Sequence, residues 1–121
     1  MRKSTLQILV VSIILILMLP QCVYNEIPEP EIPDSVSFNT DIIPIFNASC
    51  NMSGCHNQGG FDPDLSAQNA WASLQDGYVN LSAPESSTLV TAMDGGTMEP
   101  YSKDQDIALI IKWISDGAKN N

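Results

Sequence analysis

The stretch "SCNMSGCHNQGG", residues 49–60, decides how this chain builds its fold. It separates Cys50 from Cys55 by four residues, and it places His56, the single histidine of the 121-residue chain, directly after the second cysteine. Two thiols and one imidazole in so short a segment can close a disulfide loop, bind a metal ion or attach a cofactor.

The N-terminus has the pattern of an export signal. A basic start, Met1-Arg2-Lys3, precedes an almost wholly apolar run over residues 5–19. That run is short for a membrane-spanning helix, which needs about 20 apolar residues. A basic segment before a short apolar segment is typical of a secretory signal peptide, here residues 1–21. An uncleaved N-terminal membrane anchor is the alternative.

Cys22 follows the apolar run in "LMLPQC". This placement resembles the lipobox of bacterial lipoproteins, which implies that cleavage leaves Cys22 as a diacylated N-terminus. Two acyl chains anchor a protein stably to a membrane. The expected location is therefore the periplasm or cell envelope, with a lipid anchor on a membrane. The alternative is an ordinary signal peptide with Cys22 incidental.

The remainder of the chain is short and acidic. Residues 23–36, "VYNEIPEPEIPDSV", are rich in proline and glutamate, so they predict an extended tether before one domain over residues 37–121. After residue 21 the chain carries 14 acidic residues and only three basic ones, Lys103, Lys112 and Lys119. This charge disfavours nucleic acid and favours a protein partner that presents a basic patch.

Two helices are predicted in the first half of the domain. In "SFNTDIIPIFNASC", residues 37–50, Asn39 or Thr40 is the expected N-cap, and Pro44 must lie near the first turn. In "LSAQNAWASLQDG", residues 65–77, one apolar face and a closing glycine are expected. That face consists of Leu65, Ala70, Trp71 and Leu74, and the glycine is Gly77.

Two more helices are predicted in the second half. In "SAPESSTLVTAM", residues 82–93, Ser82 and Glu85 have capping-box spacing. In "SKDQDIALIIKWISDG", residues 102–117, Ser102 and Gln105 form a second capping box, and Gly117 stands at the C′ position. An isoleucine stripe in that helix consists of Ile107, Ile110, Ile111 and Ile114. The predicted fold class is all-α, with four short helices.

So small a domain buries little apolar area, and such domains often need an added staple. A covalently attached haem would supply one, because c-type attachment uses two cysteines followed by histidine. The inserted residues 51–54 must then loop outward, which Gly54 eases. Zinc is the weakest alternative, because a structural zinc site needs four cysteine or histidine ligands and only Cys50, Cys55 and His56 are available here. A Cys50–Cys55 disulfide suits an exported protein but leaves His56 unexplained.

Four segments carry a family resemblance over residues 36–121: "VSFNTDIIPIF", "GCHNQGGFDPDL", "GGTMEP" and "ALIIKWISDGAKNN". Together they resemble the small monohaem cytochrome c domains of exported or lipid-anchored bacterial proteins. The resemblance implies thioether bonds from Cys50 and Cys55 to haem c and His56 as the proximal iron ligand. It also implies Met98 as the distal iron ligand, with Met93 and Met52 as substitutes.

The expected function is one-electron transfer between envelope redox proteins, without catalysis, because both axial iron positions would be filled. A backbone carbonyl of residues 59–63 is expected to accept the second N–H of the His56 imidazole. Packing on the haem or bonding to its propionates is considered for Trp71, Trp113, Tyr78 and Tyr101. Two alternatives stay open: a haem-free binding or structural module with the disulfide, and a haem enzyme or gas sensor if Met98 is not a ligand.

Overall fold

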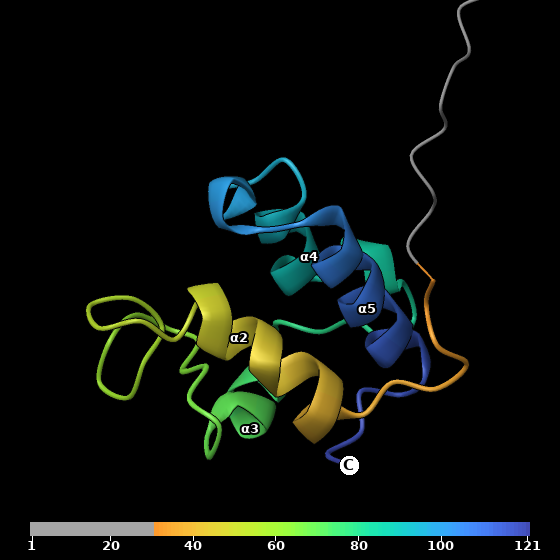
Figure 1. Ribbon diagram of the computed structural model, residues 1–121, viewed down its shortest axis with the longest axis horizontal. Coiled ribbons are helices and arrows are strands. Elements are labelled where there is room, and N and C mark those ends of the chain that lie inside the picture. The colour runs from red at the N-terminus through yellow and green to blue at the C-terminus, as the bar shows by residue number, and fades with distance from the viewer. Residues whose placement is uncertain (1–30) are drawn as a thin grey trace, which may run out of the picture.

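The computed structural model describes residues 31–121, and Figure 1 shows their helices. The predicted signal peptide, the proposed lipidation site Cys22 and most of the predicted tether lie outside these residues. The four α-helices are α2 (Ile43–Ser49), α3 (Ala70–Gln75), α4 (Thr88–Met93) and α5 (Asp104–Ser115). Residues 31–121 contain no strand, so the predicted all-α class with four short helices is confirmed. None of these helices combines the length and apolarity needed to cross a membrane.

The first helix starts earlier than predicted. A π-helical turn, η1 (Phe38–Ile42), precedes α2, and its N-cap is Ser37, whose hydroxyl accepts a hydrogen bond from the Thr40 N–H. The expected caps Asn39 and Thr40 were therefore wrong. Pro44 lies in the first turn of α2, as predicted. Since proline has no N–H and its ring crowds the carbonyl four residues earlier, a regular α-turn is disfavoured just before it.

The core forms where η1 packs against both α2 and α5. Trp113 is fully buried, and its ring centroid lies 4.9 Å from that of Phe38. Phe46 meets Phe38 edge to face at 6.4 Å. From the isoleucine stripe, Ile110 and Ile114 are fully buried. These contacts join the two ends of the described chain into one core.

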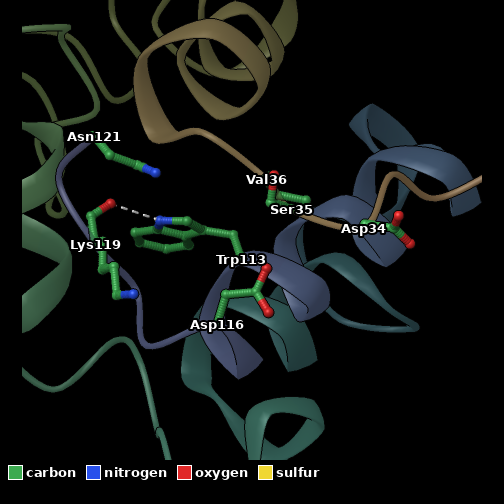
Figure 2. A pocket seen from close by; sticks show the side chains of 7 residues that line it. All are labelled: Asp34, Ser35, Val36, Trp113, Asp116, Lys119 and Asn121. Carbon is green, nitrogen blue, oxygen red and sulfur yellow. Dashed lines mark hydrogen bonds between the residues drawn. The ribbon is translucent and has the colours of Figure 1, made fainter.

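The C-terminal tail is tied back onto this core. Gly117 adopts a φ of 99°, and the N–H groups of Gly117 and Ala118 bond to the carbonyls of Ile114 and Trp113. This pattern is a Schellman motif, and it confirms Gly117 as the C′ residue of α5. The Trp113 indole N–H donates to the Lys119 carbonyl at 2.9 Å, as Figure 2 shows beside a pocket at this end of the molecule.

Two helices are shorter than their sequence patterns predict. Residues 66–69 form turns, because the Asp64 carboxylate accepts hydrogen bonds from Ser66 and Asn69 and holds the chain outside the helix. Between residues 82 and 93, a 3-10 turn, η2 (Pro84–Ser86), ends at Ser87, whose extended backbone separates it from α4. The buried Ser87 hydroxyl instead accepts the Asn80 N–H at 2.9 Å.

Candidate cofactor-attachment site

Cys50 stands at the C-terminal end of α2, where its N–H bonds to the Phe46 carbonyl at 2.9 Å. The side chain is half-buried against the core. Burial raises the pKa of the Cys50 thiol, and the neighbouring Asp106 carboxylate and Cys55 thiol raise it further. Cys50 is therefore a neutral thiol at pH 7, and it lies within electrostatic reach of Cys55 and of the start of α5.

The four residues between the cysteines form a compact turn. The Cys55 N–H bonds to the Met52 carbonyl at 2.9 Å, and the His56 N–H bonds back to the Cys50 carbonyl at 3.1 Å. Gly54 has a φ of 82°, which glycine adopts without strain. The inserted residues therefore form a turn that returns the chain to Cys50. Cys55 is exposed, and both cysteines are free thiols.

The His56 imidazole is oriented by the loop that follows it. Its Nδ1 lies 3.2 Å from the Phe61 carbonyl oxygen and 3.1 Å from the Pro63 carbonyl oxygen. Carbonyl oxygens only accept hydrogen bonds, so Nδ1 carries the proton and Nε2 keeps the lone pair. The expected carbonyl from residues 59–63 is present. In this tautomer Nε2 is the nitrogen that can bind a metal.

Residues 50–65, which we call the cysteine–histidine loop, are held together by backbone hydrogen bonds. The Phe61 N–H donates to the Cys55 carbonyl at 2.8 Å, and the Leu65 N–H donates to the His56 carbonyl at 2.7 Å. A Cβ at Gly60 would lie 2.1 Å from the Cys55 carbonyl oxygen, so the chain can approach itself here only as glycine. These contacts fix the backbone on both sides of His56.

Asp64 anchors the end of this loop to the start of α3. Its carboxylate accepts hydrogen bonds from the Ser66 N–H, the Ser66 hydroxyl and the Asn69 side-chain amide, over 2.6–2.9 Å. These bonds hold the pKa of Asp64 below its usual value, the Ser66 hydroxyl contributing most. The Asp64 N–H in turn donates to the Ser73 hydroxyl in α3.

The three methionines considered as distal ligands lie in different surroundings. Met98 is half-buried against the core, at the N-cap of the short 3-10 turn η3 (Glu99–Tyr101). Met93 is buried at the end of α4, and Met52 is 52% exposed in the inserted turn.

The aromatic residues considered near a cofactor divide into two groups. Both indole N–H groups bond to the C-terminal tail, from Trp71 to the Ala118 carbonyl at 2.8 Å and from Trp113 to the Lys119 carbonyl. The idea that these indoles bond propionates is therefore wrong for this arrangement, and Trp113 is a core residue. Tyr78 is half-buried, and Tyr101 is 64% exposed.

Sequence reasoning missed one residue near the thiols. The sequence patterns did not single out Asp106, yet its carboxylate helps to raise the pKa of the Cys50 thiol. The signal available was its place in the first turn of α5, but that position does not reveal which element lies opposite. In the part of the chain that the structure describes, no three His, Cys, Asp or Glu side chains gather in an arrangement that would hold a metal ion. A haem iron needs only one such ligand, because the porphyrin supplies four nitrogens.

Comparison of the chain with protein-family models, curated proteins and solved structures gives no match.

Proposed function

We propose that this protein is a one-electron carrier with a covalently attached c-type haem, working in the bacterial cell envelope. The observation that carries the proposal is the pair of carbonyl oxygens, from Phe61 and Pro63, within hydrogen-bond distance of His56 Nδ1. Two backbone carbonyls accept from Nδ1, which leaves the Nε2 lone pair available to bind a metal. An imidazole prepared in this way, beside two free thiols, suits a haem better than it suits a disulfide alone.

The residues present fit that cofactor. Cys50 and Cys55 would form the thioether bonds, His56 would bind the iron as proximal ligand, and Met98 would bind it from the other face. When bound, the haem supplies reversible one-electron exchange at iron. A histidine–methionine pair stabilises the reduced iron, and it leaves no open position for a substrate. This ligand set supports electron transfer rather than catalysis.

The acidic surface supports a partner with the opposite charge. The whole chain has a formal net charge of −9, and one of the three lysines of the described domain, Lys112, is paired with Asp116. We therefore propose envelope redox proteins with a basic docking patch as electron donor and acceptor. An N-terminal lipid anchor at Cys22 would keep the domain beside the membrane.

The test is a haem stain after denaturing electrophoresis, with the protein co-expressed with cytochrome c maturation factors. The wild type should keep its haem covalently, and the double variant Cys50→Ala/Cys55→Ala should lose it. Ser53→Ala, an exposed position in the same turn, is the matched control and should stain like the wild type. An unstained wild-type band would contradict the proposal. A mass two hydrogens lighter than the reduced chain would then support the disulfide-bonded, haem-free module.

A further inference from the structure

Ser102 does not have the role that its sequence position predicts. As the first residue of a capping box, it was expected to cap the last helix. Instead α5 begins at Asp104 with Lys103 as N-cap, and no side chain caps it. The Ser102 hydroxyl donates to the Met98 carbonyl at 2.9 Å, four residues earlier in the chain.

This bond completes a set that holds the backbone of Met98 from both sides. The Met98 N–H donates to the Ala92 carbonyl near the end of α4 at 2.8 Å. The Met98 carbonyl accepts the Tyr101 N–H at 3.0 Å in addition to the Ser102 hydroxyl. Upstream, a Cβ at Gly96 would lie 2.3 Å from the Thr91 carbonyl oxygen, so the loop runs tightly over α4.

We propose that Ser102 is a positioning residue that holds Met98 ready to bind the haem iron, an inference that rests on the proposed function. A thioether is a weak ligand, so a competing ligand displaces it more easily when the loop that carries it gains freedom on release. A loop that is already ordered keeps its ligand because little conformational entropy is lost on binding. The Ser102 bond contributes to that order at the ligand residue itself.

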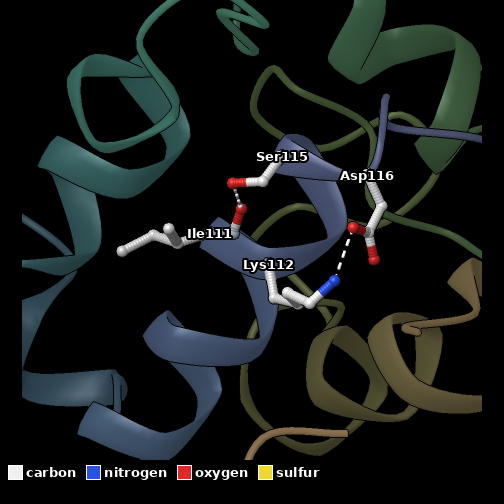
Figure 3. A network of polar contacts seen from close by, with 4 residues as sticks. All are labelled: Ile111, Lys112, Ser115 and Asp116. Carbon is white, nitrogen blue, oxygen red and sulfur yellow. Dashed lines mark hydrogen bonds and ion pairs between the residues drawn. The ribbon is translucent and has the colours of Figure 1, made fainter. Parts of the chain in front are cut away.

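The experiment is an imidazole titration of the ferric holoprotein, followed by the thioether-to-iron charge-transfer absorbance. In Ser102→Ala, half-displacement of Met98 should need about fivefold less imidazole, the effect of one ordinary hydrogen bond. Ser102→Thr keeps the hydroxyl and should restore the wild-type midpoint. Ser115→Ala is the matched control, because the Ser115 hydroxyl also donates to a backbone carbonyl four residues earlier, that of Ile111 at 2.8 Å (Figure 3), but in the exposed last turn of α5.

The outcomes separate this inference from the function on which it rests. A wild-type protein with no covalent haem overturns both. A haem protein that lacks the charge-transfer absorbance keeps the haem proposal and overturns the roles of Met98 and Ser102. Equal imidazole midpoints for Ser102→Ala and the wild type overturn the role of Ser102 alone. A lower urea midpoint in Ser102→Ala without a change in the imidazole midpoint also overturns it, because Ser102 would then be only structural.

Discussion

The core around Phe38 and Trp113 and the cysteine–histidine loop are built from different interactions. The core buries its aromatic side chains fully and joins segments from the two ends of the domain. The loop leaves Met52 and Phe61 52% and 71% exposed, and its shape comes from hydrogen bonds between backbone groups. The candidate site therefore takes its shape from backbone hydrogen bonds, whereas the core beside it is stabilised by the burial of apolar side chains.

One aromatic residue from each region gives the largest expected contrast. Trp113→Ala should lower the free energy of unfolding by about 3–5 kcal/mol, because it leaves a cavity in the core and removes the bond to Lys119. Phe61→Ala should change it by less than about 0.5 kcal/mol, since the Phe61 ring is mostly in water. Urea unfolding followed by far-ultraviolet circular dichroism measures both. Similar losses for the two variants would refute the division into core and loop.

Gly60→Ala tests whether backbone contacts set the loop. The new methyl group would collide with the Cys55 carbonyl, so the Phe61 and Leu65 amide bonds should open more often. Overpacking of this kind costs about 1–3 kcal/mol, which predicts amide exchange at these two positions about fivefold to a hundredfold faster. Hydrogen exchange by NMR reports this without any haem.

Ser53→Ala is the control for this substitution, because it lies exposed in the same loop. It should leave the exchange rates of Phe61 and Leu65 unchanged. The amides of α5 should also keep their protection in Gly60→Ala. Unchanged exchange at Phe61 in Gly60→Ala would show that this loop does not depend on the close approach of Gly60 to Cys55.

A smaller effect is expected where the core uses a polar bond. Trp71→Phe keeps most of the ring but removes the N–H that donates to the Ala118 carbonyl. The loss should be about 1 kcal/mol of unfolding free energy, the usual net value of such a bond. Tyr101→Phe, at a 64% exposed position, should leave the urea midpoint unchanged. A Trp71→Phe variant as stable as the wild type would mean that the bond from Trp71 to Ala118 adds nothing to the hold of the other contacts on the C-terminal tail.

Much of the helical framework could be predicted because it follows from local patterns. The isoleucine stripe and the Gly117 cap both follow from the sequence of residues 102–118, and the structure has them. The carbonyl partner of the His56 ring was also within reach, since residues 59–63 follow His56 directly.

The failures have a common physical cause. The hydroxyl groups of three serines form bonds that the capping patterns did not indicate. Ser37 bonds to Thr40, Ser87 to Asn80 and Ser102 to Met98. A serine hydroxyl bonds to whichever backbone group the tertiary fold brings near, and spacing alone cannot reveal that group. The effect of Asp106 on Cys50 was hidden for the same reason, because it depends on where the tertiary fold places the first turn of α5.

The smallest expected effect concerns the anchor between the loop and α3, and it depends on pH. Hydrogen bonds hold the pKa of folded Asp64 below its usual value of 3.8. Its contribution to stability is therefore complete above about pH 4 and is lost as the pH falls through the folded-state value. Asp64→Asn should lower the urea midpoint near pH 6, and the difference from the wild type should shrink as the pH falls through the folded-state pKa of Asp64. Asp62→Asn, exposed in the same loop, is the control and should differ little from the wild type at either pH. An Asp64→Asn difference that stayed constant across this range would contradict the prediction. The loss of stability would then come from altered hydrogen-bond geometry and not from the lost negative charge of Asp64.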